Sequence, residues 1–325
     1  MTIRRSDRRW LQAISYKLQA TGFRLLISRY WTEACGLKLT ATALLCSCTL
    51  AGFSQSPDTT LSHVNKKRLN TMIISSSTAY AGAMAGLNSL WYSNAPRESF
   101  HFFNDAPEWK QMDKVGHFYS AFQLSYIGSR SLQWANVPKR KSDLAGSLIS
   151  FGILTSIEVF DGFSSSYGAS VSDLAANTLG SAFYIGQNVL WDEVRIYPKF
   201  SFHQTSFAAL RPEVLGNNLS QQVLKDYNGQ TYWLSVDMDK FMPFPRWLNL
   251  AVGYGVNGMT SARRDSSSPY TPVRQYYLSL DLDLTAIHTR SKVLKTVIFF
   301  ANMIKVPMPT LEFSKNGTRA HALYF

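Results

Sequence analysis

Cysteine is scarce in this chain of 325 residues. The chain has three cysteines, and all of them lie within its first 48 residues: Cys35, Cys46 and Cys48. If the chain is cleaved after that point, the folded protein contains no disulfide, no cysteine nucleophile and no thiolate-bound metal. Sites of these kinds are therefore excluded from the part of the chain that follows residue 48.

Charged residues are also few, at 17% of the chain, and acids are fewer than bases. The 33 Lys and Arg against 21 Asp and Glu give a net charge of +12. Residues 1–38 carry eight bases and two acids, which is half of this excess, and residues 39–55 carry no charge. The remainder is spread thinly, without the basic stripe and interleaved aromatics of nucleic-acid-binding proteins. We expect no nucleic-acid partner.

Several catalytic and cofactor motifs are absent. The chain has no phosphate loop with Gly-Lys-Ser/Thr, no Gly-x-Ser-x-Gly elbow and no His-Glu-x-x-His. Gly253-x-Gly255-x-x-Gly258 imitates a nucleotide loop, but no helix is predicted after it. We therefore predict no cofactor. The mean hydropathy of −0.11 argues against a polytopic transporter, and the 14% aromatic content excludes a disordered chain.

An uncharged apolar segment covers residues 39–53, directly after Lys38. A basic region, a short apolar run and then small, turn-forming residues are the pattern of a secretory signal peptide. We therefore predict that residues 1–55 are a basic leader plus signal peptide. Because a signal that reaches residue 53 is long, residues 1–37 are either an extended basic region or the result of an over-called start codon.

Three ways of processing this leader stay open. An ordinary signal peptidase would cleave near Ser54 or Gln55. The sequence Leu-Cys-Ser-Cys at residues 45–48 also fits a lipoprotein-processing site, which makes Cys48 the candidate for lipidation. A retained signal anchor is the third. All three predict an exported cell-envelope protein, either periplasmic or associated with the inner or outer membrane.

Residues 69–192, which follow a polar linker at 56–68, predict a helical domain. Four helices are expected, at residues 71–91, 112–133, 142–160 and 171–191. The first contains Gly82-x-x-x-Gly86, which lets helices approach closely, and it is either transmembrane or buried in a soluble bundle. Ser170 is expected to cap the fourth helix. Helices that are apolar all round are buried in protein or in lipid, and both remain open here.

Residues 193–325 predict an antiparallel β-rich domain with one short helix, at 291–304. Strands are expected at residues 194–202, 231–236, 248–254 and 275–284. The last of these alternates leucines with Ser279, Asp281 and Asp283. About six short strands fall below the eight of a lipid-spanning barrel, the less favoured alternative. The expected fold class is α+β: a four-helix, bundle-like domain followed by a small antiparallel sheet that docks on a membrane surface.

Tyr232 and Trp233 form an aromatic pair in the second predicted strand. An exposed pair would bind sugar or lie at a lipid interface. Burial against the helical half is the favoured interpretation.

Few polar residues interrupt the predicted helices, and they are regularly spaced. The candidate cluster consists of Asp113, Lys114, His117, Glu158, Asp161, Asp173 and Asn177. The i,i+4 spacing places Asp113 and His117 on one helix face. Three helices of one bundle could therefore bring these side chains into a single buried site.

Carboxylates beside a histidine are what general acid–base catalysis or a hard-metal site requires. A structural polar core is the favoured alternative, with Asp173 as a cap, Asp113 in a first helical turn and Lys114 as a surface charge. Glu158 is not explained in this way, because it lies in an apolar run. A buried carboxylate needs a partner, and Lys114 or His117 is the candidate. No metal is predicted.

Three ordered motifs carry a family resemblance: Met112-Asp-Lys-x-Gly-His-Phe, Glu158-x-x-Asp161-Gly-Phe-Ser, and Tyr167-Gly-x-Ser-x-x-Asp173-x-x-x-Asn177-x-x-Gly180. Together, over about residues 65–192, they resemble the YfiM-like family of predicted periplasmic (lipo)proteins, a domain of unknown function. They are more distantly similar to the VanZ-like membrane family. That family has an Arg where this chain has Tyr167-Gly168, and a Gln where it has Asp161. The resemblance implies a location in the envelope and no particular reaction.

Two functions follow as hypotheses. The leading one is a non-enzymatic structural or binding protein of the cell envelope, associated with a membrane or lipid surface. The alternative is an envelope enzyme or amphiphile-binding protein that acts on lipid-linked or glycopeptide substrates. In that case His117 would carry the proton, Glu158 and Asp161 would be the carboxylates, and Asp113 and Asp173 would orient them. Whether the chain is an enzyme, its oligomeric state and an envelope protein partner stay open.

Overall fold

The computed structural model describes residues 63–89, 96–263 and 268–325. The predicted signal peptide and the lipidation candidate Cys48 lie outside the described residues. The fold described below is that of the described residues within 61–325, which form one compact unit.

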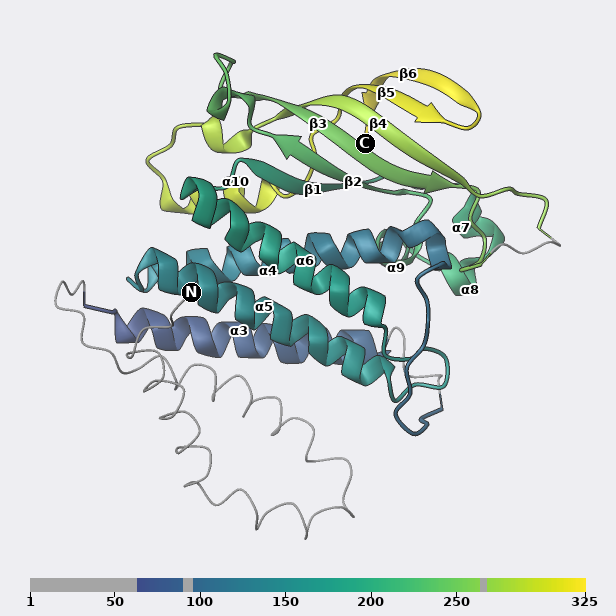
Figure 1. The fold of residues 1–325 in the computed structure, drawn as a ribbon, viewed down its shortest axis with the longest axis horizontal. Coiled ribbons are helices and arrows are strands. Elements are labelled where there is room, and N and C mark those ends of the chain that lie inside the picture. The colour runs from purple at the N-terminus through teal and green to yellow at the C-terminus, as the bar shows by residue number, and fades with distance from the viewer. Residues whose placement is uncertain (1–62, 90–95, 264–267) are drawn as a thin grey trace, which may run out of the picture. The chain divides into compact units, whose positions relative to one another are not determined.

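The four predicted helices are present and form a layer on one side of a sheet (Figure 1). They are α3 (Lys66–Leu87), α4 (Met112–Trp134), α5 (Lys139–Asp161) and α6 (Val171–Trp191). Glycine lets α4 and α5 approach each other closely. A Cβ atom on Gly146 would lie 2.5 Å from the backbone nitrogen of Ser129. The two backbones are therefore in direct contact, and α5 also packs against α6.

The first helix, α3, is more loosely attached. None of its residues is buried, although Tyr80 and Ser156 of α5 share a hydrogen bond of 2.7 Å. The predicted close approach at Gly82 and Gly86 is wrong, since a Cβ atom on either would meet nothing within 4 Å among the described residues. Of the described helices, α5 is long and apolar enough to cross a membrane by length and composition alone. It lies beside α3, α4 and α6 (Figure 1).

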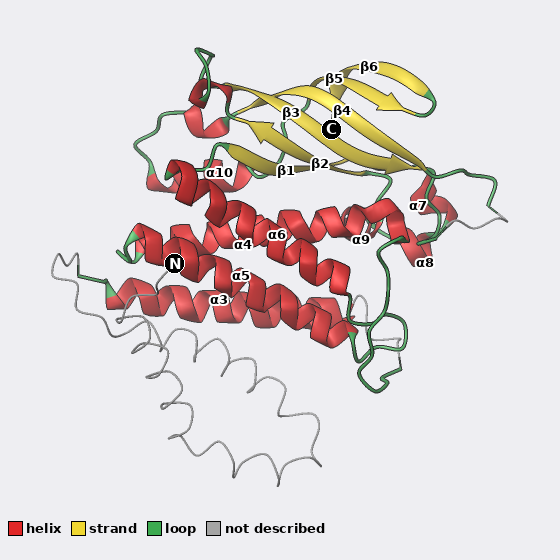
Figure 2. Cartoon of the chain, in the orientation of Figure 1, coloured by secondary structure: helices red, strands yellow, loops and turns green. Residues whose placement is uncertain are grey.

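Six antiparallel strands in sequential order make the sheet that follows (Figure 2). They are β1 (Ile196–Phe202), β2 (Gln230–Val236), β3 (Leu248–Asn257), β4 (Val273–Leu282), β5 (Met308–Ser314) and β6 (Gly317–Tyr324). The predicted α+β class, with the helical part before the sheet, is confirmed. The predicted short helix is α10 (Lys292–Ala301). Three further short helices were not predicted: α7 (Phe207–Leu210), α8 (Pro212–Leu215) and α9 (Leu219–Lys225).

The sheet meets the helical layer through β1 and β2. On α4, the ring of Tyr119 lies 6.0 Å from that of Phe200 and 5.7 Å from that of Tyr232. Trp233, the other member of the aromatic pair, points to the opposite face, where it is 1% exposed beside Tyr277. The predicted burial against the helical half therefore holds in part: Tyr232 contacts the helices and is half-buried, whereas Trp233 is buried on the other face.

The alternation along β4 is reversed with respect to an ordinary sheet in water. Its polar residues Ser279 and Asp281 are 3% and 0% exposed, whereas Leu278 between them is 38% exposed. The leucine face continues onto the neighbouring strands, because Leu278 pairs with Val252 of β3 and Leu311 of β5. The face that is turned away from the helical layer is thus polar and buried, whereas the face that carries Tyr232 exposes apolar side chains on β3, β4 and β5.

Candidate functional site

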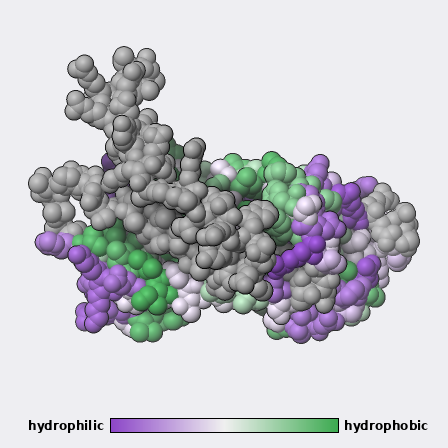
Figure 3. Space-filling view, turned by 90° about the horizontal axis from the view of Figure 1, so that it is seen from below, coloured by the Kyte–Doolittle hydropathy of each residue, from purple (hydrophilic) through white to green (hydrophobic). Residues whose placement is uncertain are grey.

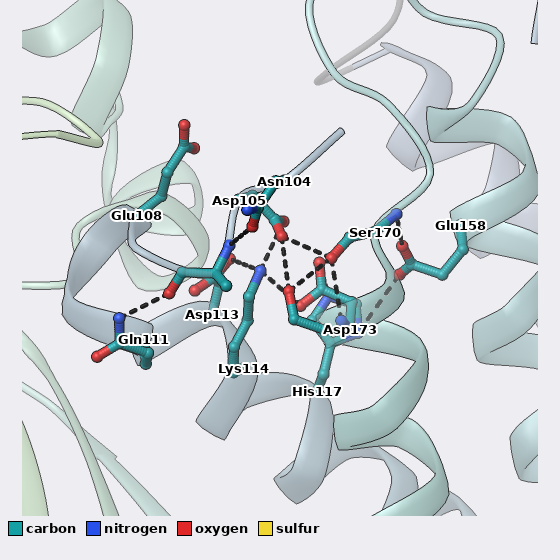
Figure 4. A network of polar contacts seen from close by, with 12 residues as sticks. Asn104, Asp105, Glu108, Gln111, Asp113, Lys114, His117, Glu158, Ser170 and Asp173 are labelled. Atoms are coloured by element: carbon teal, nitrogen blue, oxygen red, sulfur yellow. Dashed lines mark hydrogen bonds and ion pairs between the residues drawn. The ribbon is translucent and has the colours of Figure 1, made fainter. Parts of the chain in front are cut away.

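The polar residues predicted from the sequence come from three helix ends. Asp113, Lys114 and His117 lie in the first two turns of α4, Asp173 lies in the first turn of α6, and Glu158 lies in the last turn of α5. Figure 4 shows these side chains pointing toward one another between the helices.

Local sequence explains one of these helix starts. Ser170 caps α6 as predicted, with its Oγ accepting a hydrogen bond of 3.0 Å from the nitrogen of Asp173. The turn before α4 is unusual. Trp109, Lys110 and Gln111 have φ angles of 47°, 52° and 66°, in the left-handed region that costs energy for residues other than glycine. This turn reverses the chain directly before Asp113 and Lys114.

Lys114 is the centre of the network rather than a surface charge. It is 9% exposed, and its Nζ lies 2.5 Å from Asp105, 2.8 Å from Asp113 and 2.8 Å from Asp173. An ammonium group has three protons, so three carboxylates saturate it. Burial alone would lower the pKa of Lys114, but the charge of Asp113 and contacts with the other two carboxylates raise it. The lysine therefore stays charged.

Asp105 was missed by the sequence reasoning. It lies in the loop before α4, and its Oδ1 accepts hydrogen bonds from Ser170 at 2.5 Å and from Ser172 at 2.8 Å. Burial alone would raise the pKa of Asp105, but the hydrogen bonds from Lys114 and these serines lower it to about 2. No helical periodicity marks this residue. Its only signal is the turn sequence Asn-Asp-Ala-Pro at 104–107.

His117 joins this lysine centre to a second group of side chains. Its Nδ1 lies 3.0 Å from Oδ1 of Asn177 and 3.7 Å from Oε1 of Glu158, and its Nε2 lies 3.9 Å from Oδ2 of Asp173. Oε2 of Glu158 accepts a hydrogen bond of 3.2 Å from the nitrogen of Ser170. Oε1 of Glu158 and Nδ2 of Asn177 are buried and have no hydrogen-bond partner among the described residues. The network is thus closely packed but not fully satisfied.

Glu158 holds a proton at neutral pH. Burial raises its pKa to about 8, and the negative charges of Asp173 and Asp161 add to this effect. Burial also raises the pKa of Asp173, to about 6, although His117 and Lys114 oppose the shift. Asp161 lies at the end of α5 and acts on Glu158 through its charge, while the carboxylates around Lys114 are those of Asp105, Asp113 and Asp173.

Two sets of ligand atoms in the network are close enough to hold a metal ion. His117, Glu158 and Asp173 form one set, and Asp105, Asp113 and Asp173 form the other. In the second set, the ammonium of Lys114 already takes the position of the cation. In the first set, a metal would have to displace the proton of Glu158, because the ionised carboxylate is a good ligand for a hard cation and the protonated acid is not.

The network is nearly closed to solvent. The side chains of Glu158 and Asp173 are 6% and 8% exposed, and His117 is more accessible, at 23%. The arrangement can therefore store a proton on Glu158 and fix the loop at Asp105 to the starts of two helices. Access for a large substrate would need a rearrangement of this loop.

Comparison with known proteins identifies the segment that contains this network. No curated protein and no solved structure matches the chain. The more distant similarity to VanZ-like proteins is not shown by these comparisons. The exported, cell-envelope location predicted from the leader agrees with the description of a matching family model. Over residues 101–188, which run from the loop before Asp105 almost to the end of α6, the chain matches the model of the family described as predicted periplasmic lipoprotein (DUF2279).

Proposed function

We propose that this chain is a non-enzymatic cell-envelope protein that lies on a lipid surface through the exposed apolar residues of β3, β4 and β5. The observation that carries the proposal is a row of apolar neighbours on three strands. Val252, Leu278 and Leu311 lie side by side and are 49%, 38% and 42% exposed. Tyr276 and Phe313, which pair in the next outward-facing row, are 53% and 41% exposed.

Water alone would not favour this arrangement. Burying apolar surface contributes about 25 cal/mol per Å², so an ordinary sheet directs its leucines toward the core. Here the buried face holds Ser279 and Asp281, and the leucines are outside. A contiguous exposed apolar patch is typical of an interaction site, and an apolar outer face with a polar inner face is typical of strands that meet lipid.

The helical layer adds to the apolar surface. Leu148 on α5 and Leu179 on α6 are 50% and 62% exposed. Seen from the side of the helices, the described residues show hydrophobic patches (Figure 3). These patches support attachment to a surface, whereas the closed polar network offers no open site for a substrate. Both points favour a structural or binding role.

Vesicle flotation tests the proposal. The chain is used without its predicted leader, as residues 56–325, so that neither an acyl group nor the apolar leader contributes. We expect Val252→Ser, Leu278→Ser and Leu311→Ser, made together, to reduce the bound fraction about tenfold or more, because each removes apolar contact with the bilayer. The matched control changes three equally exposed leucines of α7–α9, Leu210, Leu219 and Leu224, to serine. Equal binding by both triple variants would contradict the proposal.

A second candidate function rests on one observation, the proton held by Glu158 beside His117. A carboxylic acid with a pKa near 8 could act as a general acid on a lipid-linked or glycopeptide substrate once the loop at Asp105 opens. In that case Glu158→Gln would abolish activity or binding in the envelope while the protein stays folded. Retention of full biological activity by Glu158→Gln would exclude this candidate.

A further inference from the structure

A cavity of about 480 Å³ lies far from the polar network, at the other end of the helical layer. Its walls come from the last turns of α4 and α6, the start of α5 and the loops at Asp237, Arg246 and Asp283. Along α4, the step from Lys114 to Arg130 is 16 residues, or about 24 Å. The cavity is therefore a separate site.

Some of the charges around the cavity neutralise one another. Nζ of Lys139 lies 3.0 Å from Asp143 and 3.1 Å from Asp192, and Nζ of Lys240 lies 3.1 Å from Glu193. These pairs close the rim between α5, α6 and the sheet loops. They leave no charge for a ligand.

Other positively and negatively charged side chains that line the cavity form no such ion pair within the described part of the chain. Arg130 and Arg246 are exposed and form no salt bridge within the described part of the chain. Asp237 is 5% exposed, and its Oδ1 has no hydrogen-bond partner among the described residues. Asp239 and Asp283 line the same cavity; Asp239 shares a side-chain hydrogen bond with Asp237, and both act on Asp237 through their charges. A buried, unpaired carboxylate oxygen is costly, so it indicates a missing cationic or donor group.

Aromatic rings line the cavity together with these positively and negatively charged side chains. The rings of Tyr126 and Tyr197 lie 6.4 Å apart and both line the cavity. An ammonium group is recognised by carboxylates together with the faces of aromatic rings. A phosphate or carboxylate group is recognised by the guanidinium fork of arginine. The cavity presents both kinds of recognition.

We propose that this cavity binds a small zwitterion. Its ammonium group would lie against Asp237, Asp239 and the tyrosine rings, and its phosphate or carboxylate group would lie against Arg130 and Arg246. Ethanolamine phosphate has this chemistry, both as a free molecule and as the headgroup of a phospholipid. The volume accommodates either. The proposal does not depend on lipid attachment through the sheet, because different residues carry it.

Isothermal titration with the full chain tests the inference, using free ethanolamine phosphate up to about 10 mM. Vesicle binding forms a second arm, comparing phosphatidylethanolamine with phosphatidylglycerol, which lacks the amine. The variants are Asp237→Asn and Arg130→Gln, and the matched controls are Glu213→Gln and Arg290→Gln. Because Arg130 is exposed, its variant stays informative even if Asp237→Asn fails to fold.

We expect the wild type and both controls to bind, and each cavity variant to weaken binding about tenfold or more. Binding of the free molecule identifies a soluble ligand, and a preference confined to phosphatidylethanolamine vesicles identifies a lipid headgroup; both support the inference. Equal binding of inorganic phosphate alone would overturn it, because the ammonium would then contribute nothing. So would the absence of binding in both arms, or binding that Arg130→Gln leaves unchanged.

Discussion

The sheet and the helical layer each bury a lysine, and the two lysines are balanced differently. In the sheet, Lys199 and Asp281 have fully buried side chains 2.7 Å apart. Nζ of Lys199 donates its other hydrogen bonds to neutral acceptors, Oδ1 of Asn302 and the carbonyl of Leu282, at 3.0 Å each. In the helical layer, Lys114 faces three carboxylates.

This difference in balance decides which charge each region carries in excess. In the sheet, Lys199 and Asp281 neutralise each other, and the excess is positive: Lys305 is 2% exposed, and burial together with the charge of Lys199 lowers its pKa to about 8, against the charge of Asp281. In the helical layer, negative charge is in excess, and burial raises the pKa of Glu158 to about 8 so that it stays protonated. Both regions are thus sensitive to pH, the sheet through a buried lysine and the helical layer through a buried carboxyl group.

The largest effect is expected from breaking the balanced pair. Lys199→Met leaves the carboxylate of Asp281 buried and without its cation. We expect a loss of about 3–5 kcal/mol in the free energy of unfolding, measured by urea denaturation. Lys292→Met, on the exposed surface of α10, is the matched control and should cost less than about 0.5 kcal/mol. A loss below about 1 kcal/mol for Lys199→Met would show that the pair is not structural.

A smaller and pH-dependent loss is expected in the helical layer. Lys114→Met should cost about 2–3 kcal/mol at pH 7, because its three carboxylates are partly hydrated and can take up protons. Their pKa values would rise, so the loss should be smaller at pH 5 than at pH 8. Urea denaturation at these two pH values measures the difference. A loss independent of pH would contradict the unbalanced-charge account.

The smallest effect concerns Glu158 itself. Its pKa is about 8 in the folded protein against an ordinary value of 4.5, so the folded state holds a proton that the unfolded state releases. The stabilisation is full below about pH 4.5 and is lost as the pH rises to about 8. We expect Glu158→Gln to remove this slope and to change stability by less than about 1 kcal/mol at pH 5, since the amide replaces a neutral acid there. At higher pH the variant should become more stable than the wild type, because it has no proton to release on unfolding.

Thermal melts between pH 5 and pH 9 measure the slope for the wild type and for Glu158→Gln. Glu213→Gln, an exposed control, should keep the wild-type slope. Burial also raises the pKa of Asp173, which therefore contributes a remaining slope in the same direction near pH 6. An identical slope in the wild type and Glu158→Gln would mean that Glu158 is already ionised.

Much of the fold could be predicted from the sequence, because periodicity and capping are local signals. The Ser170 cap and the alternation of β4 each lie within a few residues of what they determine. The orientation of β4 could not be predicted in this way. The alternation does not indicate which face of the strand is buried. That depends on Lys199, 82 residues away, which forms an ion pair with Asp281.

The candidate network shows the same limit. The spacing of Asp113, His117 and Asp173 indicates helix faces, and the structure brings these residues together. It does not indicate that Lys114 points inward, because a lysine after a helix start is usually solvated. Asp105 belongs to a loop without periodicity, so its part in the network depends on tertiary contacts alone.

The left-handed turn before α4 has a consequence for the order of assembly. Its backbone is held from the sheet side: the nitrogen of Trp109 donates to the carbonyl of Ala262 at 2.7 Å, and the hydroxyl of Tyr254 donates to the carbonyl of Lys110 at 2.5 Å. Arg274 bonds the side chain of Gln111. These partners follow the turn by well over a hundred residues. During synthesis and export, the helices therefore exist before anything can hold the turn, and the lysine centre closes only after the third and fourth strands have arrived.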